Sequence, residues 1–429
     1  MSTLRRRALG LAAIAGVAAL VLTACGRDGG TPAPEDTDGD AEVVASPGIT
    51  DDNLLFGIST PLTGATAGPG NCTADGAIAY FGTKNAEGGI EFGDGVTRTI
   101  EIRKYDDEYN PERSAANFQQ MVADGVFAAG IGLGTPTNRA WRDAAIEEEV
   151  PQVLVMTGDP LFNDREESPW QLGLVPIYQQ EGAAFGEVLA ASTEDHKVAI
   201  LFQNDDYGQG YVEGFKEAIE GAGNIEIVGE LTYEPSAPSL EGQITELSAT
   251  GADVLFHAVS VVPRAIENLQ KAQSLGWFPS WFLPSNTASP GGVLTPGGAV
   301  AADGALVYPG IYAVSFSAAA ASPPFQESEE GQAYFAAIEE YTENDGFSFP
   351  HCVWSWIAAQ ILEQAFMEME EPTRESFMAA LLAIDGFEAQ FLLPGGSINT
   401  TTDGLPAVQD VVLQSFNGRG YANVESFGG

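Results

Sequence analysis

The chain has very little positive charge. Its 429 residues include 18 Lys and Arg against 60 Asp and Glu, which gives a formal net charge of −42. Lysine is especially scarce and occurs only at positions 84, 104, 197, 216 and 271. A surface with such an excess of negative charge repels the phosphates of DNA and RNA. The composition therefore argues against a nucleic-acid partner.

Histidine and cysteine are also scarce, with three residues of each. None of His196, His257 and His351 has another His, Cys or carboxylate at a metal-ligand spacing. The chain lacks a Gly-x-Ser-x-Gly nucleophile motif, and the glycine-rich run at 130–134 lacks both dinucleotide spacing and a phosphate-loop Lys. We therefore expect no catalytic residue, no metal and no cofactor, and an extracytoplasmic enzyme is the weakest of the functions considered.

The first residues indicate export from the cytoplasm. Arg5, Arg6 and Arg7 precede a short apolar run at 8–21, and the small residues after it lead to Cys25. The run is too short for a stable membrane span and has the pattern of a signal peptide. A Cys at the cleavage point resembles the bacterial lipoprotein signal. We expect residues 1–24 to be a signal peptide, Cys25 to carry a lipid, and the protein to lie outside the cytoplasmic membrane, anchored to it.

Residues 25–52 are rich in Gly, Pro, Asp and Thr and have almost no bulky apolar side chains before Val43. Such a segment buries too little apolar surface to offset its ordering entropy, so we expect a flexible tether. The remaining chain is long enough for two domains, and no later segment is apolar enough to cross a membrane.

Apolar strand patterns alternate with helical patterns through the rest of the chain. The strands are almost continuously apolar, which is typical of parallel strands with helices on both faces. This pattern predicts an α/β protein with two doubly wound lobes. The predicted strands lie at 54–58, 99–103, 126–133, 152–156, 198–202, 225–233 and 254–258, and the predicted helices at 77–84, 112–124, 138–148, 212–222, 240–249 and 263–275.

An ordered set of short motifs covers nearly all of residues 53–429. They are Thr60-Pro61-Leu62-Thr63-Gly64, Asp75-Gly76-Ala77, Asn85-Ala86-Glu87-Gly88-Gly89-Ile90, Gly134-Thr135-Pro136-Thr137-Asn138, Val150-Pro151-Gln152, Tyr207-Gly208-Gln209-Gly210, Val353-Trp354 and Leu393-Pro394-Gly395-Gly396. This set resembles the leucine/isoleucine/valine-binding protein family of ABC importer receptors. The resemblance implies the type I periplasmic-binding-protein fold, with three hinge strands between two lobes.

The resemblance also implies lobe boundaries and partners. We expect lobe 1 at 53–173 plus 311–395 and lobe 2 at 174–310 plus 396–429. A monomer would capture a small solute, such as a branched-chain amino acid or a related amide or carboxylate, and deliver it to an ABC permease. A sensory receptor of the same fold would instead pass its closed state to a signalling partner, and the sequence leaves that alternative open.

Candidate ligand-binding residues follow the predicted strands. Thr137 stands at a helix start, where free backbone N–H groups favour an anion, and the resemblance implies a carboxylate-binding hydroxyl there. Its alternative role is to cap its own helix. Thr135 is a weaker candidate for the same carboxylate, and Thr157 and Gly158 follow the next strand. In the second lobe, Tyr207 is expected to close over the ligand.

Two positions depart from the pattern that the family uses for an α-amino acid. The aromatic position of the first loop falls near Pro69, and the acidic position of the second lobe falls near Asn286 or Thr287. A buried ammonium would lack its counter-charge beside an amide such as that of Asn286. The ligand then uses a substitute acid, or it is a short amide, a urea-like compound or an aromatic carboxylate. The candidate substitutes are Asp159, Asp206 and Glu108.

Cys72 and Cys352 remain after lipidation of Cys25. An even pair outside the cytoplasmic membrane favours a disulfide bond, and two separate buried thiols are the alternative.

Overall fold

The computed structural model describes residues 43–424 and 426–428, which belong to one compact unit. The predicted signal peptide, the lipidation site at Cys25 and the tether as far as residue 42 lie outside the described residues. Within the described part of the chain, no helix combines the length and the apolar character that a bilayer crossing needs.

The first lobe is built around a six-stranded sheet of order β2-β3-β1-β4-β5-β6. Neighbouring strands run parallel except for the antiparallel pair β2–β3. The central strands are short and almost entirely buried, as their continuous apolar runs predict. The strands are β1 (Asn53–Thr60), β2 (Ile90–Glu91), β3 (Thr97–Asp106), β4 (Ala128–Gly130), β5 (Gln152–Val155) and β6 (Gln171–Gly173).

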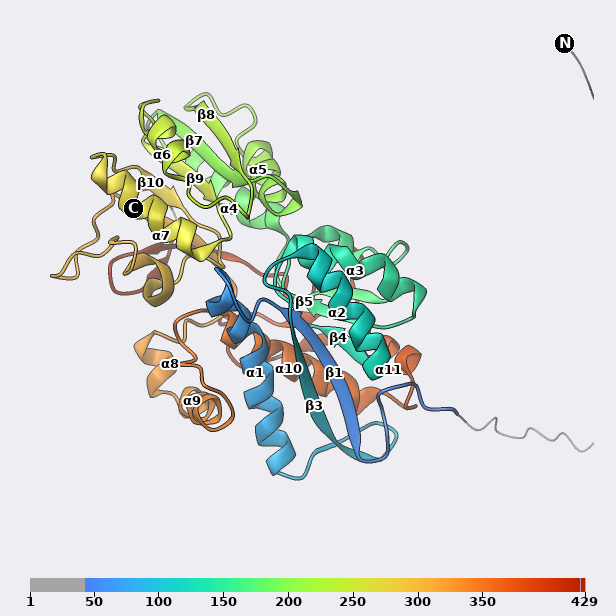
Figure 1. Cartoon of the computed structure of the whole chain (residues 1–429). Coiled ribbons are helices and arrows are strands. Elements are labelled where there is room, and N and C mark those ends of the chain that lie inside the picture. The colour runs from blue at the N-terminus through green and yellow to red at the C-terminus, as the bar shows by residue number, and fades with distance from the viewer. Residues whose placement is uncertain (1–42, 425, 429) are drawn as a thin grey trace, which may run out of the picture. The chain divides into compact units, whose positions relative to one another are not determined.

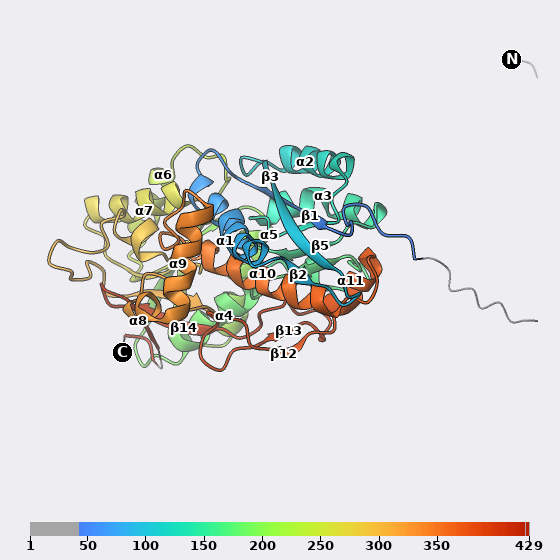
Figure 2. The same ribbon diagram turned by 90° about the horizontal axis from the view of Figure 1, so that it is seen from below.

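Helices cover both faces of this sheet. Figure 2 shows α2 (Pro111–Asp124) and α3 (Thr135–Glu147) on one side of the strands, with α10 (His351–Glu368) and α11 (Arg374–Leu381) on the other. The long helix α1 (Ala67–Ala86) packs against α10. The lobe is completed by η1 (Pro160–Asn163), α8 (Pro323–Glu327), α9 (Glu329–Tyr341), β12 (Asp385–Phe387) and β13 (Ile398–Asn399).

The second lobe has a seven-stranded sheet of order β15-β14-β11-β10-β9-β7-β8, with α4 to α7 around it (Figure 1). Along β7, Val198 and Ile200 pack with α4 and α5, whereas Ala199 and Leu201 pack on the opposite face with α6 and α7. Both faces are therefore covered, and the predicted doubly wound architecture is confirmed. The elements are α4 (Tyr178–Ala190), β7 (His196–Gln203), α5 (Asp206–Ala218), β8 (Ile225–Tyr233), α6 (Glu241–Ser248), β9 (Val254–Ala258), α7 (Val262–Ser274), β10 (Ser280–Phe282), η2 (Pro290–Leu294), β11 (Ile311–Ser315), β14 (Val412–Phe416) and β15 (Tyr421–Asn423).

Two of the three passages of the chain between the lobes come later than the predicted points near residues 310 and 395, whereas the first lies near residue 173, between β6 and α4. β11 pairs with β10 and β14, so it belongs to the second sheet, and the return to the first lobe follows Ser315. The last crossing also comes later, because the N–H groups of Ala407 and Val408 donate to the carbonyls of Gly173 and Leu174. Residues as far as Val408 therefore belong to the first lobe.

The predicted tether ends before residue 52. Ile49 is buried in the first lobe, and the N–H of Ser46 donates to the carbonyl of Pro372. Gly48 has φ of +85° and lies so close to the backbone of Phe127 that a Cβ there would clash. Residues 46–50 therefore dock on the folded lobe.

Helix α1 begins ten residues before the predicted start at Ala77. Its first half contains Gly70 and Gly76, where an added Cβ would come within 1.9 Å of the Pro61 carbonyl oxygen and 2.1 Å of the Cys352 carbonyl oxygen. Glycines disfavour a helix in isolation, but here they let α1 approach its neighbours closely, so packing overrides propensity.

The close approach of α1 and α10 also brings two cysteines together. Cys72 and Cys352 form a disulfide bond between these helices, with their Cα atoms 4.3 Å apart. The two residues are 280 positions apart in the sequence. A cross-link over so long a loop removes much conformational freedom from the unfolded chain.

We predict that reducing this bond lowers the stability of residues 43–429 by about 2–5 kcal/mol, as for other native disulfides. Thermal unfolding with and without dithiothreitol measures the effect. The Cys72→Ser/Cys352→Ser double variant serves as the control, because its melting temperature should be low and insensitive to reductant. Equal melting temperatures for the oxidised and reduced wild-type chain would contradict the prediction.

Candidate functional site

A pocket lies where the strand ends of the two lobes face each other, and residues of both lobes line it. About 520 Å³ of space, part of it open to solvent, lies between its walls. We call it the interlobe pocket. The lining residues are Thr66, Pro69, Tyr109, Leu133, Gly134, Met156, Val175, His351 and Trp354 from the first lobe, and Tyr178, Glu181, Tyr207, Tyr211, Ser260, Ser285 and Asn286 from the second.

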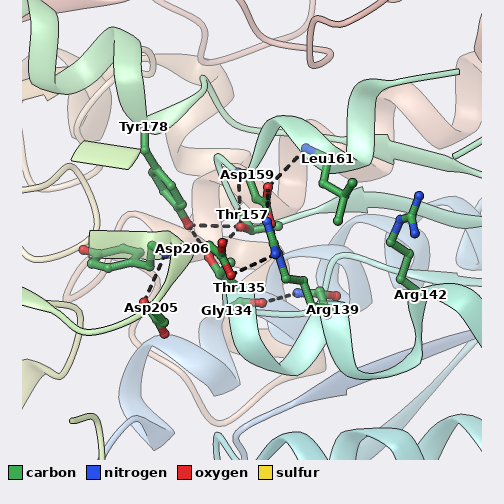
Figure 3. Close-up of polar contacts among 12 residues, drawn as sticks. Gly134, Thr135, Arg139, Arg142, Thr157, Asp159, Leu161, Tyr178, Asp205 and Asp206 are labelled. Carbon is green, nitrogen blue, oxygen red and sulfur yellow. Dashed lines mark hydrogen bonds and ion pairs between the residues drawn. The ribbon is translucent and has the colours of Figure 1, made fainter. Parts of the chain in front are cut away.

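Three buried hydroxyls meet at one side of the pocket (Figure 3). The Oγ1 atoms of Thr135 and Thr157 lie 2.8 Å apart, and the hydroxyl oxygen of Tyr178 lies 3.0 Å from the first and 3.1 Å from the second. Thr135 opens α3 and Thr157 follows β5, whereas Tyr178 is the first residue of α4 in the second lobe. The two predicted threonines are thus together, but their hydroxyls bind Tyr178, whose side chain lines the pocket.

Gly158 supports the same tyrosine. A Cβ at this position would lie 2.4 Å from the carbonyl oxygen of Pro176 and 2.6 Å from the ring of Tyr178. Position 158 accommodates only glycine without a clash, because Tyr178 packs against its backbone. Like Thr135 and Thr157, Gly158 stands behind the lining of the pocket.

Thr137 is not among the residues that line the pocket. Its hydroxyl donates to backbone carbonyl oxygens of the preceding turn, 2.7 Å away at Leu133 and 3.1 Å away at Gly134. The side chain is buried in this arrangement, but it does not cap α3, because the N-cap residue is Gly134 and no side chain caps the helix. Leu133 and Gly134, the latter with φ of +106°, are the residues of this loop that line the pocket.

Tyr207 and Asn286 both line the pocket and contact each other. The hydroxyl of Tyr207 donates to Oδ1 of Asn286 at 3.0 Å, although the residues are 79 positions apart. The carboxylate of Asp205 accepts from the N–H groups of Tyr207 and Gly208 and so caps α5. This cap sets Tyr207 in the first turn of the helix, at the carboxyl edge of the second sheet.

The three acids suggested as partners of a ligand ammonium already have counter-charges, and none of them lines the interlobe pocket. Arg139 contacts Asp159 at 3.0 Å and also reaches Asp206 of the second lobe at 2.8 Å (Figure 3). Glu108 is paired with Arg113 at 2.6 Å. Glu108 and Asp206 are exposed, whereas Asp159 is buried, and each of the three carboxylates has an arginine as its counter-charge.

Glu181 is the acid that the sequence analysis missed. It lies in the first turn of α4, its exposed fraction is only 1%, and its carboxylate accepts from the N–H of Ser285 at 3.1 Å and from Oγ of Ser285 at 2.9 Å. It has no ion-pair partner among the described residues. Burial raises the pKa of Glu181 to about 7. An acid in the first turn of a helix usually faces water, so the sequence carries no sign of its burial.

Aromatic rings form much of the remaining wall. Tyr178, Tyr207 and Tyr211, here called the tyrosine cluster, have ring centroids 4.7–5.1 Å apart. Trp354 of α10, in the first lobe, also lines the pocket, and its Nε1 donates to Oγ of Ser317 at 3.0 Å. Tyr109 reaches across the lobes, with its hydroxyl oxygen 3.4 Å from Oγ of Ser260.

His351 is buried at the pocket with neither ring nitrogen hydrogen-bonded to any described residue. Burial lowers the pKa of His351 to about 3, so its imidazole is neutral at neutral pH. No group of three or more His, Cys, Asp and Glu side chains within the described ranges has the arrangement of a metal site. The pocket is equipped to bind a small polar molecule between aromatic walls.

We predict that Glu181→Gln changes the pH dependence of folding stability. Because the pKa of Glu181 is raised to about 7 in the folded protein, the native state binds more protons than the unfolded state between about pH 4.5 and pH 7. Stability therefore falls as pH rises through this range. The variant should gain about 1–3 kcal/mol at pH 8 and little at pH 4.5.

Chemical denaturation at pH 4.5, 6 and 8 measures this difference. Glu230→Gln is the control, since Glu230 lies on β8 in an exposed pair with Lys216 at 2.7 Å. Part of the slope should persist in both variants, because burial also raises the pKa of Asp107 to about 7. Parallel profiles for wild type and Glu181→Gln would contradict the prediction.

Comparison with known proteins gives relatives with partial sequence matches. Leu/Ile/Val-binding protein homolog 3 of Brucella melitensis biotype 1 is 25% identical over 214 residues, covering 48% of this chain and 54% of the relative. Leu/Ile/Val-binding protein homolog 2 of Brucella abortus (strain 2308) is 27% identical over 219 residues, covering 50% and 56%. The chain spans about half the length of these curated relatives.

Solved structures match over a larger part of the chain. A fatty acid ABC transporter substrate-binding protein from Thermomonospora curvata superposes with a TM-score of 0.72 and 20% identity, covering 90% of this chain and 94% of that one. A solute-binding protein of R. palustris in complex with 4-hydroxybenzoate has a TM-score of 0.70 and 20% identity, covering 88% and 97%. A leucine-binding protein from Thermotoga maritima has a TM-score of 0.68 and 14% identity, covering 86% and 97%. At such identities these likenesses show the fold.

The family comparison covers the described lobes almost completely. The model of the periplasmic binding protein family matches residues 55–420, from β1 past the end of β14. The resemblance drawn from the ordered motifs is therefore confirmed. The chain belongs to the periplasmic binding protein family and has its type I fold, with two lobes around an interlobe pocket.

Proposed function

We propose that this protein is an extracytoplasmic solute-binding protein that captures a small solute between its lobes and delivers it to the permease of an ABC importer. The observation that carries the proposal is the interlobe pocket, whose walls come from both lobes. A solute in such a pocket contacts both halves and so favours the state in which they are together. Enclosure of this kind needs no chemical change in the solute.

The names of the relatives support a small organic solute. Curated relatives are named for leucine, isoleucine and valine, and a structural neighbour was solved with 4-hydroxybenzoate. These molecules share a polar group on a compact apolar body, which suits a pocket with aromatic walls and a few polar groups. A branched-chain amino acid or a related amide is therefore a reasonable first candidate.

We propose further that the mature protein is held at the membrane by a lipid on Cys25. The support is the sequence pattern of the export signal, with Arg5–Arg7, the apolar run and the small residues before Cys25. The segment after Cys25 would then act as the tether for the folded lobes.

Two contacts across the lobes are suited to stabilise the closed state. Arg139 of α3 pairs with Asp159 in its own lobe and with Asp206 of α5 in the other, and Tyr109 approaches Ser260. An exposed ion pair contributes little to stability by itself, but one that spans the lobes adds to closure each time a solute binds.

We predict that the cognate solute raises the melting temperature and compacts the protein. A thermal-shift screen of residues 43–429 against amino acids, amides, ureas, amines and aromatic acids identifies the solute, because a ligand of the native state stabilises it. Small-angle scattering then compares the free and saturated forms. Turnover of the solute, or identical scattering profiles with and without saturating solute, would contradict the proposed function.

We predict that Asp206→Asn weakens solute affinity about 2–5-fold at low salt, the effect of losing an exposed ion pair of up to about 1 kcal/mol. The loss should shrink at 1 M salt, since salt screens the pair in the wild type. Glu230→Gln is matched as an acid-to-amide change in a pair confined to the second lobe, and should leave affinity unchanged. If Asp206→Asn bound the solute with wild-type affinity at low salt, the pair of Arg139 and Asp206 would contribute nothing to closure.

A further inference from the structure

We propose that the interlobe pocket takes a small organic cation, with its ammonium group beside the carboxylate of Glu181 and against the rings of the tyrosine cluster. This inference rests on the proposed function and names the class of solute for the same pocket.

The charges around the pocket are unbalanced. Glu181 is an acid that lines it, and no Lys or Arg is among the lining residues. The nearby arginine of the site, Arg139, is occupied by Asp159 and Asp206. A buried carboxylate without a counter-charge is costly, and burial accordingly raises the pKa of Glu181. A cation that enters the pocket supplies the missing charge.

The carboxylate of Glu181 is held ready for a ligand. Ser285 donates to it twice, from the backbone and from the side chain, and the hydroxyl of Tyr211 also hydrogen-bonds to it, which leaves part of the carboxylate's accepting capacity for a ligand. Its position on α4 is one turn beyond Tyr178, which bonds to the threonines of the first lobe. Hydrogen bonds therefore hold the side chain of Glu181 and the start of α4 in place before a solute binds.

Aromatic faces reinforce the preference for positive charge. The rings of Tyr178, Tyr207 and Tyr211 pack around one another at 4.7–5.1 Å, and Tyr109 and Trp354 also line the pocket. The face of an aromatic ring attracts a cation, most strongly where water is excluded, and alkylated ammonium groups are bound in this way. A carboxylate in the same place would have no cationic partner among the lining residues.

His351 adds a requirement for a neutral polar group on the solute. Its ring is 1% exposed, and both nitrogens lack partners among the described residues. A neutral imidazole offers one N–H donor and one acceptor, and a buried group left without partners is costly. A hydroxyl, amide or ester on the cation would satisfy it. The neutral ring also means that His351 supplies no positive charge for an anion.

Binding calorimetry at pH 8 with five probes tests this inference. Choline is a permanent cation with a hydroxyl group, and leucinamide is a cation with an amide group in its protonated form, which makes up about half of this probe at pH 8. Leucine is a zwitterion, and isovalerate and benzoate are carboxylates. We expect leucinamide and choline to bind at least about 10-fold more tightly than leucine, and the carboxylates not to saturate. Tighter binding of leucine, or binding of the carboxylates in place of the cations, would overturn the inference.

Two sets of variants test the assigned groups. Glu181→Gln should weaken binding of both cations about 10–100-fold, as expected for loss of a buried charge-assisted contact, whereas Glu230→Gln should not. Tyr207→Leu should weaken choline binding about 5–20-fold, and Tyr207→Phe should largely retain it because the ring face remains. Melting temperatures of all variants verify that they fold. Unchanged choline affinity in folded Glu181→Gln would overturn the inference.

The inference and the proposed function fail separately. If a carboxylate binds and scattering shows that the lobes close on it, solute capture stands and the cation assignment is wrong. If none of the five probes binds, the cation assignment is wrong as well, and the wider solute screen decides whether the protein captures solutes.

Discussion

The site depends on one joint between the lobes, the three-hydroxyl contact of Thr135, Thr157 and Tyr178. Two of these residues stand at the carboxyl edge of the first sheet, and the third begins the first helix of the second lobe. Because all three hydroxyls are buried, each must find a partner, and the geometry that satisfies them sets the start of α4. That helix carries both Tyr178 and Glu181 into the interlobe pocket.

The remaining walls follow from the topology of the two sheets. Parallel strands end at one edge of each sheet, and the connections that follow them present side chains there. Tyr109 follows β3 and Gly134 follows β4, while Ser260 and Ser285 follow β9 and β10. Three passages of chain between the lobes hold these edges face to face. The pocket is therefore a consequence of how the sheets are connected, and its chemistry depends on which residues occupy the loops.

The charge distribution gives the pocket a character different from that of the surface. The chain as a whole is strongly acidic, and its exposed acids meet water and arginine partners such as Arg113 and Arg139. Glu181 is buried and has no arginine partner among the residues that the structure describes, and its burial opposes folding at neutral pH. The free-energy cost of burying this carboxylate beside the pocket can be removed by a ligand of opposite charge. Ionisable groups with strongly shifted pKa values are common in functional sites.

Local sequence patterns were enough to predict two doubly wound lobes, because continuous apolar strands and amphipathic helices carry that information along the chain. They also pointed to the loops that contain Thr135, Thr157 and Tyr207, which lie at strand ends. The docking of residues 46–50, the early start of α1 and the burial of Glu181 were decided by tertiary contacts. From the sequence alone, Glu181 would be a solvent-facing residue at the start of a helix. In the structure it is hydrogen-bonded to Ser285, which lies more than a hundred positions later in the chain. Contacts over such distances leave no periodic trace in the sequence, so only the assembled structure could show which polar groups face the pocket.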